Sequence, residues 1–422
     1  MSTGHPSGLR GSNLVNGALA IVVVWLGYFL VNINITLIIP LISFMQQDIN
    51  LSDREAGALL ASFPVVALVS NIAIGPFIDR YGRKRFIIAG AIGCAVTLLL
   101  TAMAENGIMV SLGRASTGLF MPMIGSSIFA AVADYFPKTA RTRVTGYVMS
   151  ASPVAFLISM PLGVMLGASV GWRVPILALS ALSISIAICA SMLPATDHNE
   201  ISNVSITATT YIDRLLSFSL SRDTRALLLS YFCFSAAALI FLGLYPTWVI
   251  ADGLAGVGTR AVGTLLFLGG LGGLSGALLS GWLAKFFRHP LELCAVAAFA
   301  TGIATLVIPL ITGGVALQTA GYGVFSFGRA LMLSLIVSCA MGLVPAIERG
   351  SLNATLNAIF QTASAIGGVA SAWFYKLYPD FVANSVASAA LFAIAGILLW
   401  GGGASRSADA KIRSDSVKFT SD

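Results

Sequence analysis

The sequence is poor in charge, because Asp, Glu, Lys and Arg together make up only 10% of its 422 residues. An ordinary soluble domain carries about 25% charged residues. Hydrophobic residues make up 57% of the chain, and they recur in long apolar stretches. A helix needs about 20 such residues to cross the hydrocarbon core of a bilayer. The composition therefore excludes a typical soluble domain and predicts an all-α integral membrane protein.

Residue types that support catalysis or metal binding are also scarce. The three histidines lie in tails or loops, and no predicted span has an acidic residue near its middle. The five cysteines fall inside apolar stretches without paired spacing, which is typical of small core residues. The chain has no glycine-rich phosphate loop followed by Lys-Ser/Thr. We therefore expect no enzyme, no cofactor and no metal site.

The apolar stretches predict about twelve membrane-spanning helices. Their approximate ranges are 14–44, 56–78, 86–104, 108–134, 144–170, 174–193, 226–250, 259–284, 291–312, 315–344, 351–375 and 382–401. A single long polar loop divides six helices from six, which predicts a duplicated unit. The expected organisation is a tail at 1–13, a six-helix bundle at 14–193, a linker at 194–225, a second six-helix bundle at 226–403 and a tail at 404–422.

The net charge of +7 is explained by the side of the membrane on which the basic residues fall. Most Lys and Arg residues fall in the two tails and in the loops on one side of the predicted membrane. The exceptions are Arg54, Arg173, Arg260, Lys376 and the two intramembrane arginines, Arg114 and Arg329. Basic loops stay in the cytoplasm. We therefore expect a bacterial-type inner membrane location with both termini cytoplasmic, a lipid bilayer as surroundings and no nucleic-acid partner. The first apolar run is too long for a cleavable signal, so we expect an uncleaved anchor.

The densest charge lies between the second and third predicted helices, in Gly75-Pro-Phe-Ile-Asp79-Arg80-Tyr-Gly82-Arg83-Lys84-Arg85. Four cations and an aspartate between two apolar runs must lie at a membrane surface, and the two runs form a transmembrane hairpin. A weaker counterpart closes the eighth helix, in Gly281-Trp-Leu-Ala-Lys285-Phe-Phe-Arg288-His289. The second copy has lost the aspartate, so the two halves are not chemically equivalent.

These patterns together resemble the major facilitator superfamily. The resemblance rests on the basic loop, the six-plus-six layout, Arg114-x-x-x-Gly118, Asp134-Tyr-Phe-Pro137 and Gly171-Trp172-Arg173. It covers about the whole chain. It implies two pseudo-symmetric six-helix bundles around a central cavity, and transport of a small organic solute by alternating access. It also implies coupling to protons, and we expect a monomer.

For the basic loop the resemblance implies a gate. Asp79 would lie against the start of helix eleven, where helix amides carry partial positive charge, and Arg83 would reach Asp134. Together with Gly75, Arg80 and Gly82 of the same motif, these contacts would hold the two bundles together when the cavity opens outward. They would break when the cavity opens inward. The alternative is that the basic side chains anchor the hairpin at anionic lipid head groups. For Lys84 and Arg85 we favour this alternative.

Arg114 and Arg329 are the basic residues that lie well inside predicted spans, where an ionisable group is costly and usually functional or paired. The resemblance matches Arg114 to an arginine associated with proton transfer. Alternatively, Arg114 extends to the nearby outer surface. Arg329 is deeper, on a helix that lines the cavity in this family, and we predict that it contacts substrate. The internal repeat places Tyr322, not Arg329, at the position equivalent to Arg114.

Polar and aromatic residues at helical spacing complete the predicted substrate site. They are Asn32 and Asn34 on helix one, Tyr231 and Trp248 on helix seven, and Asn353, Asn357 and Gln361 on one face of helix eleven. The alternative is interhelical hydrogen bonding, which uses the same residue types. The glycines of helix eight, from Gly269 to Gly281, predict close helix packing.

Two arginines without buried acids favour an anionic or neutral polar solute over a cation. Pro161-Leu-Gly163 and Gly171-Trp-Arg173 resemble drug-and-sugar efflux antiporters, whereas Asp134-Tyr-Phe-Pro137 resembles organic-anion symporters that work in uptake. We favour efflux. A further alternative is a transporter-like receptor that binds a ligand without moving it. Such a receptor needs an output domain or a long tail, and residues 404–422 form only a short polar one.

Overall fold

The computed structural model describes residues 7–81, 83–194, 222–253, 258–287, 289–311, 314–343 and 349–401. All regular structure in these ranges is helical. The α-helices are α1 (Ser7–Asp48), α2 (Asp53–Tyr81), α3 (Arg83–Ala102), α4 (Gly107–Tyr135), α5 (Lys138–Met149), α6 (Ala151–Val170), α7 (Arg173–Ser191), α9 (Arg222–Leu242), α10 (Tyr245–Trp248), α11 (Thr259–Leu283), α12 (Pro290–Val307), α13 (Val315–Leu343), α14 (Arg349–Leu377) and α15 (Val382–Gly401). Short helical turns of other types follow α10, α11 and α12, at Val249–Gly253, Ala284–Phe286 and Ile308–Leu310.

Nine helical stretches among the described residues are long and apolar enough to cross a membrane. Three further helices, α2, α4 and α14, have 29 residues each and pack among them. At 1.5 Å per residue each is roughly 44 Å long, which exceeds a hydrocarbon core of about 30 Å. The predicted all-α membrane fold is confirmed. Most of the predicted ranges agree with these helices to within a few residues.

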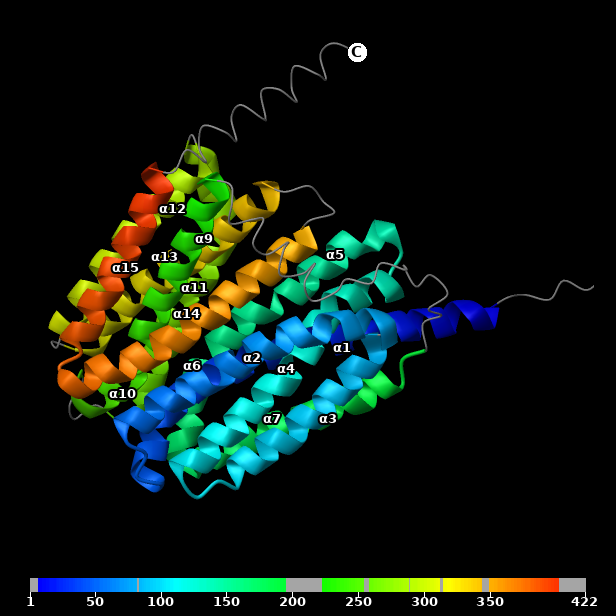
Figure 1. Ribbon diagram of the computed structural model, residues 1–422, viewed down its shortest axis with the longest axis horizontal. Helices are drawn as coiled ribbons and strands as arrows, with labels where there is room; N and C mark the ends of the chain where they lie inside the picture. Colours follow the sequence, from blue (N-terminus) through cyan, green and yellow to red (C-terminus); the bar gives the residue numbers. More distant parts are fainter. Residues whose placement is uncertain are drawn as a thin grey trace, which may run out of the picture.

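The helices form two groups of consecutive elements (Figure 1). In the first group α1 packs on α4 and α6, α2 packs on α4, and α3 packs on α4 and α7. In the second group α9 packs on α14 and α15, α11 packs on α13, and α12 packs on α13 and α15. Between the groups, contacts concentrate on two pairs, α2 with α14 and α6 with α11. The chain thus forms two helical bundles that share one interface.

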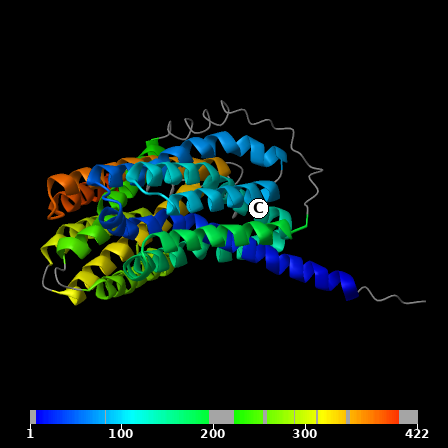
Figure 2. The same ribbon diagram turned by 90° about the horizontal axis from the view of Figure 1, so that it is seen from below.

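The bundles approach each other closely where α2 begins and α14 ends. A Cβ atom added to Gly57 would lie 2.8 Å from the Cβ of Ala372, and one added to Gly368 would lie 2.7 Å from the Cβ of Leu60. Away from this contact the two groups spread apart, toward the ends that carry α5 and the start of α12 (Figure 1). Seen from below, the first part of α1 projects beyond the other helices (Figure 2).

Local sequence signals set the helix starts on the side of the α2–α14 contact. Before α2, the Glu55 amide donates to Ser52 Oγ at 3.3 Å, and the Ser52 amide donates to Glu55 Oε2 at 2.9 Å. This reciprocal pair is a capping box. The hydroxyl and then the amide of Ser52 hold the pKa of Glu55 below its ordinary value. Before α4, Asn106 Oδ1 accepts from the Met109 amide at 2.9 Å.

Two of the predicted spans are interrupted by a proline. The span predicted at 144–170 is divided at Ser150 into α5 and α6, and the span predicted at 226–250 is divided after Leu242 into α9 and α10. Each break lies one turn before a proline, Pro153 or Pro246. The proline nitrogen carries no hydrogen and cannot donate to the last carbonyl of the preceding helix. A proline alone does not predict such a break, because α1, α4 and α6 continue through Pro40, Pro122 and Pro161.

The glycines of α11 bring this helix into backbone contact with α13, as predicted. A Cβ atom added to Gly272 would lie 2.3 Å from the carbonyl oxygen of Gly323, and one added to Gly276 would lie 2.3 Å from that of Phe327. A Cβ atom added to Gly269 would lie 2.4 Å from the ring of Tyr322. Any larger side chain would push the two helices apart. These glycines therefore set the geometry of the second bundle.

Candidate functional site

The predicted site residues fall in three places in the structure. The basic turn lies at one end of the first bundle, Arg114 lies inside that bundle, and Arg329 lies between the bundles. Within the described ranges, no three His, Cys, Asp or Glu side chains come together in a group that could hold a metal ion.

At the basic turn, the Arg83 guanidinium forms an ion pair with Asp134 at the end of α4. Only 28% of the Arg83 side chain and 17% of the Asp134 side chain is exposed, so water only partly screens the pair. The surroundings of Gly75, the side chains of Asp79 and Arg80 and the whole of Gly82 lie outside the described part of the structure. The predicted contact of Asp79 with the start of α14 lies outside it too.

Lys84 joins α3 to the end of α7. Its Nζ donates to the carbonyl oxygen of Ser191 at 2.9 Å and to that of Leu193. The hydroxyl of Tyr135, next to Asp134, donates to the carbonyl oxygen of Pro194 at 3.1 Å. Lys84 thus satisfies carbonyl groups that a helix end leaves unpaired and lies favourably in the helix dipole. The assignment of Lys84 to lipid head groups alone misses this contact.

Arg114 lies inside the first bundle, not at its surface. Only 5% of the residue is exposed, and its Nη1 donates to Oδ1 of Asn34, which is 2% exposed. The guanidinium also lies over the ring of Phe63 on α2, with Cζ 4.6 Å from the ring centroid. One turn later, a Cβ atom at Gly118 would meet the Phe63 carbonyl oxygen at 2.6 Å. Gly118 therefore lets α2 come close enough for this contact, and the alternative of a surface-directed Arg114 is wrong.

The Arg114 site is incompletely paired. Nε of Arg114 and Nδ2 of Asn34 have no hydrogen-bond partner. A cavity of about 10 Å³ lies beside them, also lined by Thr101 and Thr117, and this is close to the smallest space that holds one water molecule. A buried cation without an acidic partner is energetically costly. The site therefore leaves two buried hydrogen-bond donors that a water molecule in the cavity could pair.

Arg329 on α13 contacts the first bundle. Its Cζ lies 4.4 Å from the ring centroid of Phe156 on α6, a cation–π arrangement that gains strength where water is excluded. The ion pairs among the described residues are Arg83 with Asp134 and Arg173 with Asp48, so no described acid neutralises Arg329. Tyr322, two turns earlier on α13, is buried and stacks on Tyr245 with ring centroids 5.2 Å apart.

Tyr231 and Trp248 are core residues of the second bundle in this structure. They are 6% and 2% exposed. Tyr231 stacks on Phe234 at 6.1 Å, and Trp248 stacks on Phe381 at 5.2 Å between ring centroids. Both rings are therefore covered by neighbouring aromatic residues, and their predicted contact with substrate stays a prediction.

The polar candidates on α1 and α14 differ in their surroundings. Asn32 donates from Nδ2 to the Tyr28 carbonyl oxygen at 2.8 Å, and its Oδ1 accepts from Ser152 Oγ on α6 at 2.8 Å. This is the interhelical bonding that the sequence left open as the alternative for these residue types. On α14, Asn357 is exposed and Gln361 is buried. The side chain of Asn353 lies outside the described part of the structure.

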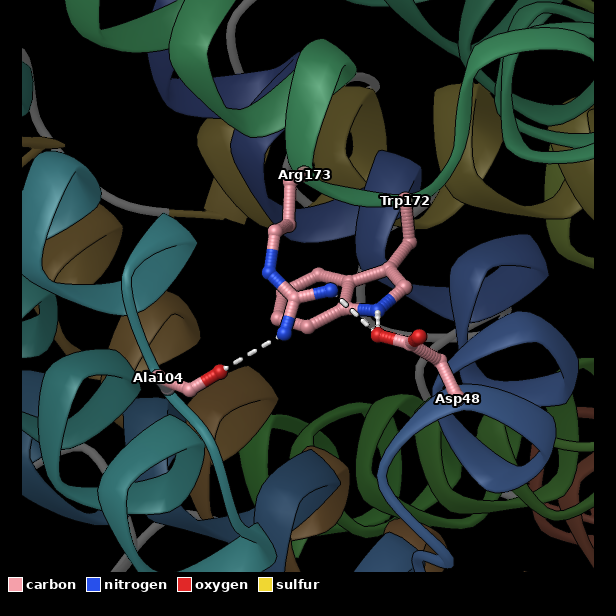
Figure 3. A network of polar contacts seen from close by, with 4 residues as sticks. All are labelled: Asp48, Ala104, Trp172 and Arg173. Atoms are coloured by element: carbon pink, nitrogen blue, oxygen red, sulfur yellow. Dashed lines mark hydrogen bonds and ion pairs between the residues drawn. The ribbon is translucent and has the colours of Figure 1, made fainter.

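A second ion-pair network lies at the opposite end of the first bundle (Figure 3). Arg173 pairs with Asp48 at the end of α1, and Trp172 Nε1 donates to the same carboxylate at 2.9 Å. Arg173 also donates to the Ala104 carbonyl oxygen at 3.1 Å, and its Cζ lies 4.4 Å from the Trp172 ring centroid. Gly171 makes the turn with φ +86°, which favours glycine. The network ties together α1, α7 and the α3–α4 turn.

Sequence reasoning missed two of these residues. Phe156 is one apolar residue among many in an apolar stretch, and nothing local indicates that it faces an arginine more than 170 positions later in the chain. Asp48 follows the first span without a motif. Its partners, Trp172 and Arg173, are noticeable in the sequence, but their pairing with Asp48 depends on the packing of α1 against α7.

Comparisons with known proteins agree with this architecture. The sequence profile of the Major Facilitator Superfamily matches residues 24–372. The uncharacterised MFS-type transporter YceJ of Bacillus subtilis is 23% identical over 374 residues, which are 87% of this chain and 93% of that protein. A bacterial homologue of the human lysosomal transporter Spinster, solved in an inward-facing and occupied conformation, superimposes with a TM-score of 0.74 at 14% identity. The superposition covers 92% of this chain and 96% of that one.

Two shorter matches are to resistance proteins. Multidrug resistance protein 2 of Bacillus subtilis is 28% identical over 160 residues, which are 38% of this chain and 40% of that protein. The quinolone resistance protein NorA of Staphylococcus aureus is 26% identical over 164 residues, which are 39% of this chain and 42% of that protein. Both matches therefore involve less than half of each chain.

Proposed function

The chain belongs to the major facilitator superfamily, and from this premise we propose that it moves a small organic solute across the membrane by proton-coupled alternating access. It is a multi-pass membrane protein. We further propose a monomer in the cytoplasmic membrane with both termini and the basic turn on the cytoplasmic side, because basic loops are retained there. The absence of a nucleotide-binding motif from the sequence favours an ion gradient as the energy source.

The contact between Arg329 and Phe156 is the observation that supports transport most directly. It joins α13 of one bundle to α6 of the other, with Cζ 4.4 Å from the ring centroid. A rocking motion of the bundles would break this contact and uncover the guanidinium. An anionic group of a solute could then replace the ring, because a carboxylate binds arginine more strongly than an aromatic face does. In this proposal Arg329 binds substrate, and Phe156 covers it when the site is empty.

We assign proton coupling to Arg114. Its guanidinium is buried, has no described acidic partner and lies beside a water-sized cavity. Proton-linked changes in hydration or hydrogen bonding at this position would be transmitted to α1 through Asn34 and to α2 through Phe63. Both helices belong to the bundle that rocks, so a local change can be converted into motion.

We assign gating to the basic turn. The ion pair between Arg83 and Asp134 fixes the start of α3 to the end of α4, and Lys84 fixes it to the end of α7. Asp79 would complete the latch by contacting the start of α14 in the other bundle. In this proposal Arg83 and Lys84 hold the turn rigid, and Asp79 makes the contact that breaks in each cycle.

The direction we propose is efflux, supported by the resemblance of part of the chain to a multidrug resistance protein and a quinolone resistance protein. The second candidate is proton-coupled uptake of a small organic anion. It is favoured by Arg329, which has no described acidic partner to neutralise it. A transporter-like receptor without flux is the third.

Transport assays with purified protein in liposomes distinguish these candidates. A quinolone and a set of small organic anions would be tested with a pH gradient of either orientation and without one. Solute that moves in the same direction as the protons indicates symport. Solute that moves in the direction opposite to the protons indicates antiport. Binding without flux under every gradient would support the receptor and contradict the proposal.

Arg329→Gln tests the substrate role. We expect its apparent affinity for the transported solute to fall about tenfold or more, because a hydrogen bond to a charged group contributes about 1.5–3 kcal/mol. Arg260→Gln is the matched control, because Arg260 is an exposed arginine at the start of α11. If Arg329→Gln transports every accepted anion like the unsubstituted protein, Arg329 has no role in substrate binding.

A further inference from the structure

An apolar groove of about 500 Å³ runs along the outside of the first bundle, between α3 and α7. Its walls include Ile92, Val96 and Leu99 from α3 and Ile184 and Ile188 from α7. These side chains are 44–57% exposed. In a membrane protein such a surface faces hydrocarbon, so the groove is open to the lipid phase.

The groove offers no polar group to a water-soluble ligand. Two of its lining residues are serines, Ser180 and Ser191. Ser180 Oγ donates to the Ala95 carbonyl oxygen at 2.7 Å, and Ser191 Oγ donates to the Ile188 carbonyl oxygen at 2.6 Å. Both hydroxyl donors are thus used within the protein. The chemistry of the walls fits a hydrocarbon chain.

One end of the groove is basic. Arg85 precedes the lining residues Ile88 and Ile92 by three and seven positions, which places it on the same face of α3. Arg85 is exposed and takes no part in the ion pairs of the described residues. Lys84 beside it reaches the carbonyl oxygen of Ser191, the lining residue at the end of α7. The positive end of the groove is therefore fixed at the membrane surface where α3 begins.

The length of the groove corresponds to one lipid leaflet. From Ile88 to Leu99, α3 rises roughly 16 Å at 1.5 Å per residue. This is about half of a hydrocarbon core of about 30 Å. A lipid with its head group at Arg85 would therefore place one acyl chain along the whole groove, within a single leaflet.

We propose that this groove and Arg85 form a binding site for one anionic phospholipid. The acyl chain lies between α3 and α7, and the head-group phosphate pairs with Arg85. The occupant differs from the transported solute, and the site lies on the lipid-facing side of the bundle, away from Arg329. Bound lipid would hold α3 and α7 together. The basic turn depends on both helices, because Arg83 and Lys84 belong to α3 and Lys84 contacts the end of α7.

The test is native mass spectrometry of the full chain in detergent, titrated with phosphatidylglycerol or with phosphatidylcholine of the same acyl chains. We expect one bound phosphatidylglycerol to be retained in preference to phosphatidylcholine. Arg85→Gln should reduce this preference about fivefold, the contribution of one basic residue beside an anionic lipid surface. The matched control is Arg225→Gln, because Arg225 is an exposed arginine at the start of α9 in the other bundle and its loss should leave the preference unchanged.

A second pair of variants tests the hydrocarbon part of the site. Ile184→Trp fills the groove and should reduce retention of both lipids equally, whereas Ile303→Trp alters an exposed residue of α12 and should change nothing. The proposal is overturned if Arg85→Gln keeps the full preference, or if Ile184→Trp retains as much lipid as the unsubstituted protein. A protein dimer that Ile184→Trp dissociates, with no lipid retained, would overturn it in favour of a second copy.

Discussion

The two bundles bury different chemistry. In the first, Arg114 pairs with Asn34, and each has a nitrogen without a partner. In the second, Tyr322, which the internal repeat predicts at the position equivalent to Arg114, stacks on Tyr245. Tyr245 donates to Gln318, whose amide nitrogen donates to the carbonyl oxygens of Ile308 and Ile311 at 2.9 and 2.7 Å. The first centre is thus polar and incompletely paired, and the second is aromatic and well paired.

The ends of the bundles differ in the same way. Both ion pairs of the described residues belong to the first bundle, Arg83 with Asp134 at one end and Asp48 with Arg173 at the other. The second bundle relies on aromatic rings and on the close contact of α11 with α13. The first bundle thus combines ion pairs with close helix packing, as at Gly118, whereas the described part of the second bundle is held by packing.

The largest expected effect is on the aromatic core of the second bundle. Phe241 is fully buried and contacts the rings of Tyr245, Phe325 and Phe381. Phe241→Ala should lower the free energy of unfolding by about 3–5 kcal/mol, because it leaves a cavity that the neighbouring rings cannot fill. The thermal unfolding midpoint in detergent measures this, with Ile397→Ala at an exposed position of α15 as the control. An equal loss in both variants would show that the ring cluster contributes nothing special.

The polar centre of the first bundle should respond in the opposite direction. Replacing a buried charge and its partner by apolar residues is often neutral or stabilising by about 1–4 kcal/mol. The double variant Arg114→Met with Asn34→Leu should therefore unfold at a higher temperature and lose gradient-driven transport. Tyr322→Phe, the control in the second bundle, keeps its stack on Tyr245 and should cost about 1 kcal/mol at most. A double variant that is less stable would show that the pair contributes to folding.

The glycine contact between α11 and α13 comes next. Gly276→Ala places a methyl group 2.3 Å from the Phe327 carbonyl oxygen and should destabilise the protein by about 1–3 kcal/mol, a usual cost of overpacking. Gly281→Ala on the same helix meets nothing within 4 Å and should stabilise by up to about 1 kcal/mol, since alanine is the better helix former. Thermal midpoints of opposite sign are expected. The same sign for both would mean that α11 does not depend on the close contact.

The smallest effect is expected at the exposed end of the first bundle. Asp48→Asn removes the charge that pairs with Arg173. The side chains of Arg173 and Asp48 are 39% and 48% exposed. An exposed pair contributes about 0.2–1 kcal/mol, and high salt should reduce the difference from the unsubstituted protein. Arg54→Gln, at an exposed arginine nearby in α2, is the control. A difference that persists at high salt would indicate that the hydrogen bond from Trp172 carries the effect.

Much of the fold could be predicted because membrane spans depend on short-range properties. Twenty apolar residues in a row require a helix, and loops with basic residues fix its orientation, so the ranges of α3, α11 and α15 agree with their predicted spans within a few residues. The breaks before Pro153 and Pro246 were not predicted, because window-averaged hydropathy does not register a missing N–H group and other helices continue through a proline.

The site was only partly predictable, because its contacts are long-range. The pairing of Arg83 with Asp134 followed from a family resemblance. The direction of the Arg114 side chain did not follow from its depth, since both the surface and the bundle interior were within reach. The interior was selected by Asn34 on α1, by Phe63 on α2 and by Gly118, which lets α2 come close.

By itself the sequence determined the membrane class, the helical spans, the family and the two intramembrane arginines, because hydrophobic length and the cost of a buried charge are properties of single segments. Tertiary structure alone decided what each arginine contacts. Asn34, Phe63 and Phe156 lie between 51 and 173 positions away along the chain from their arginines. Apolar helices resemble one another in sequence, and only their packing determines which faces meet.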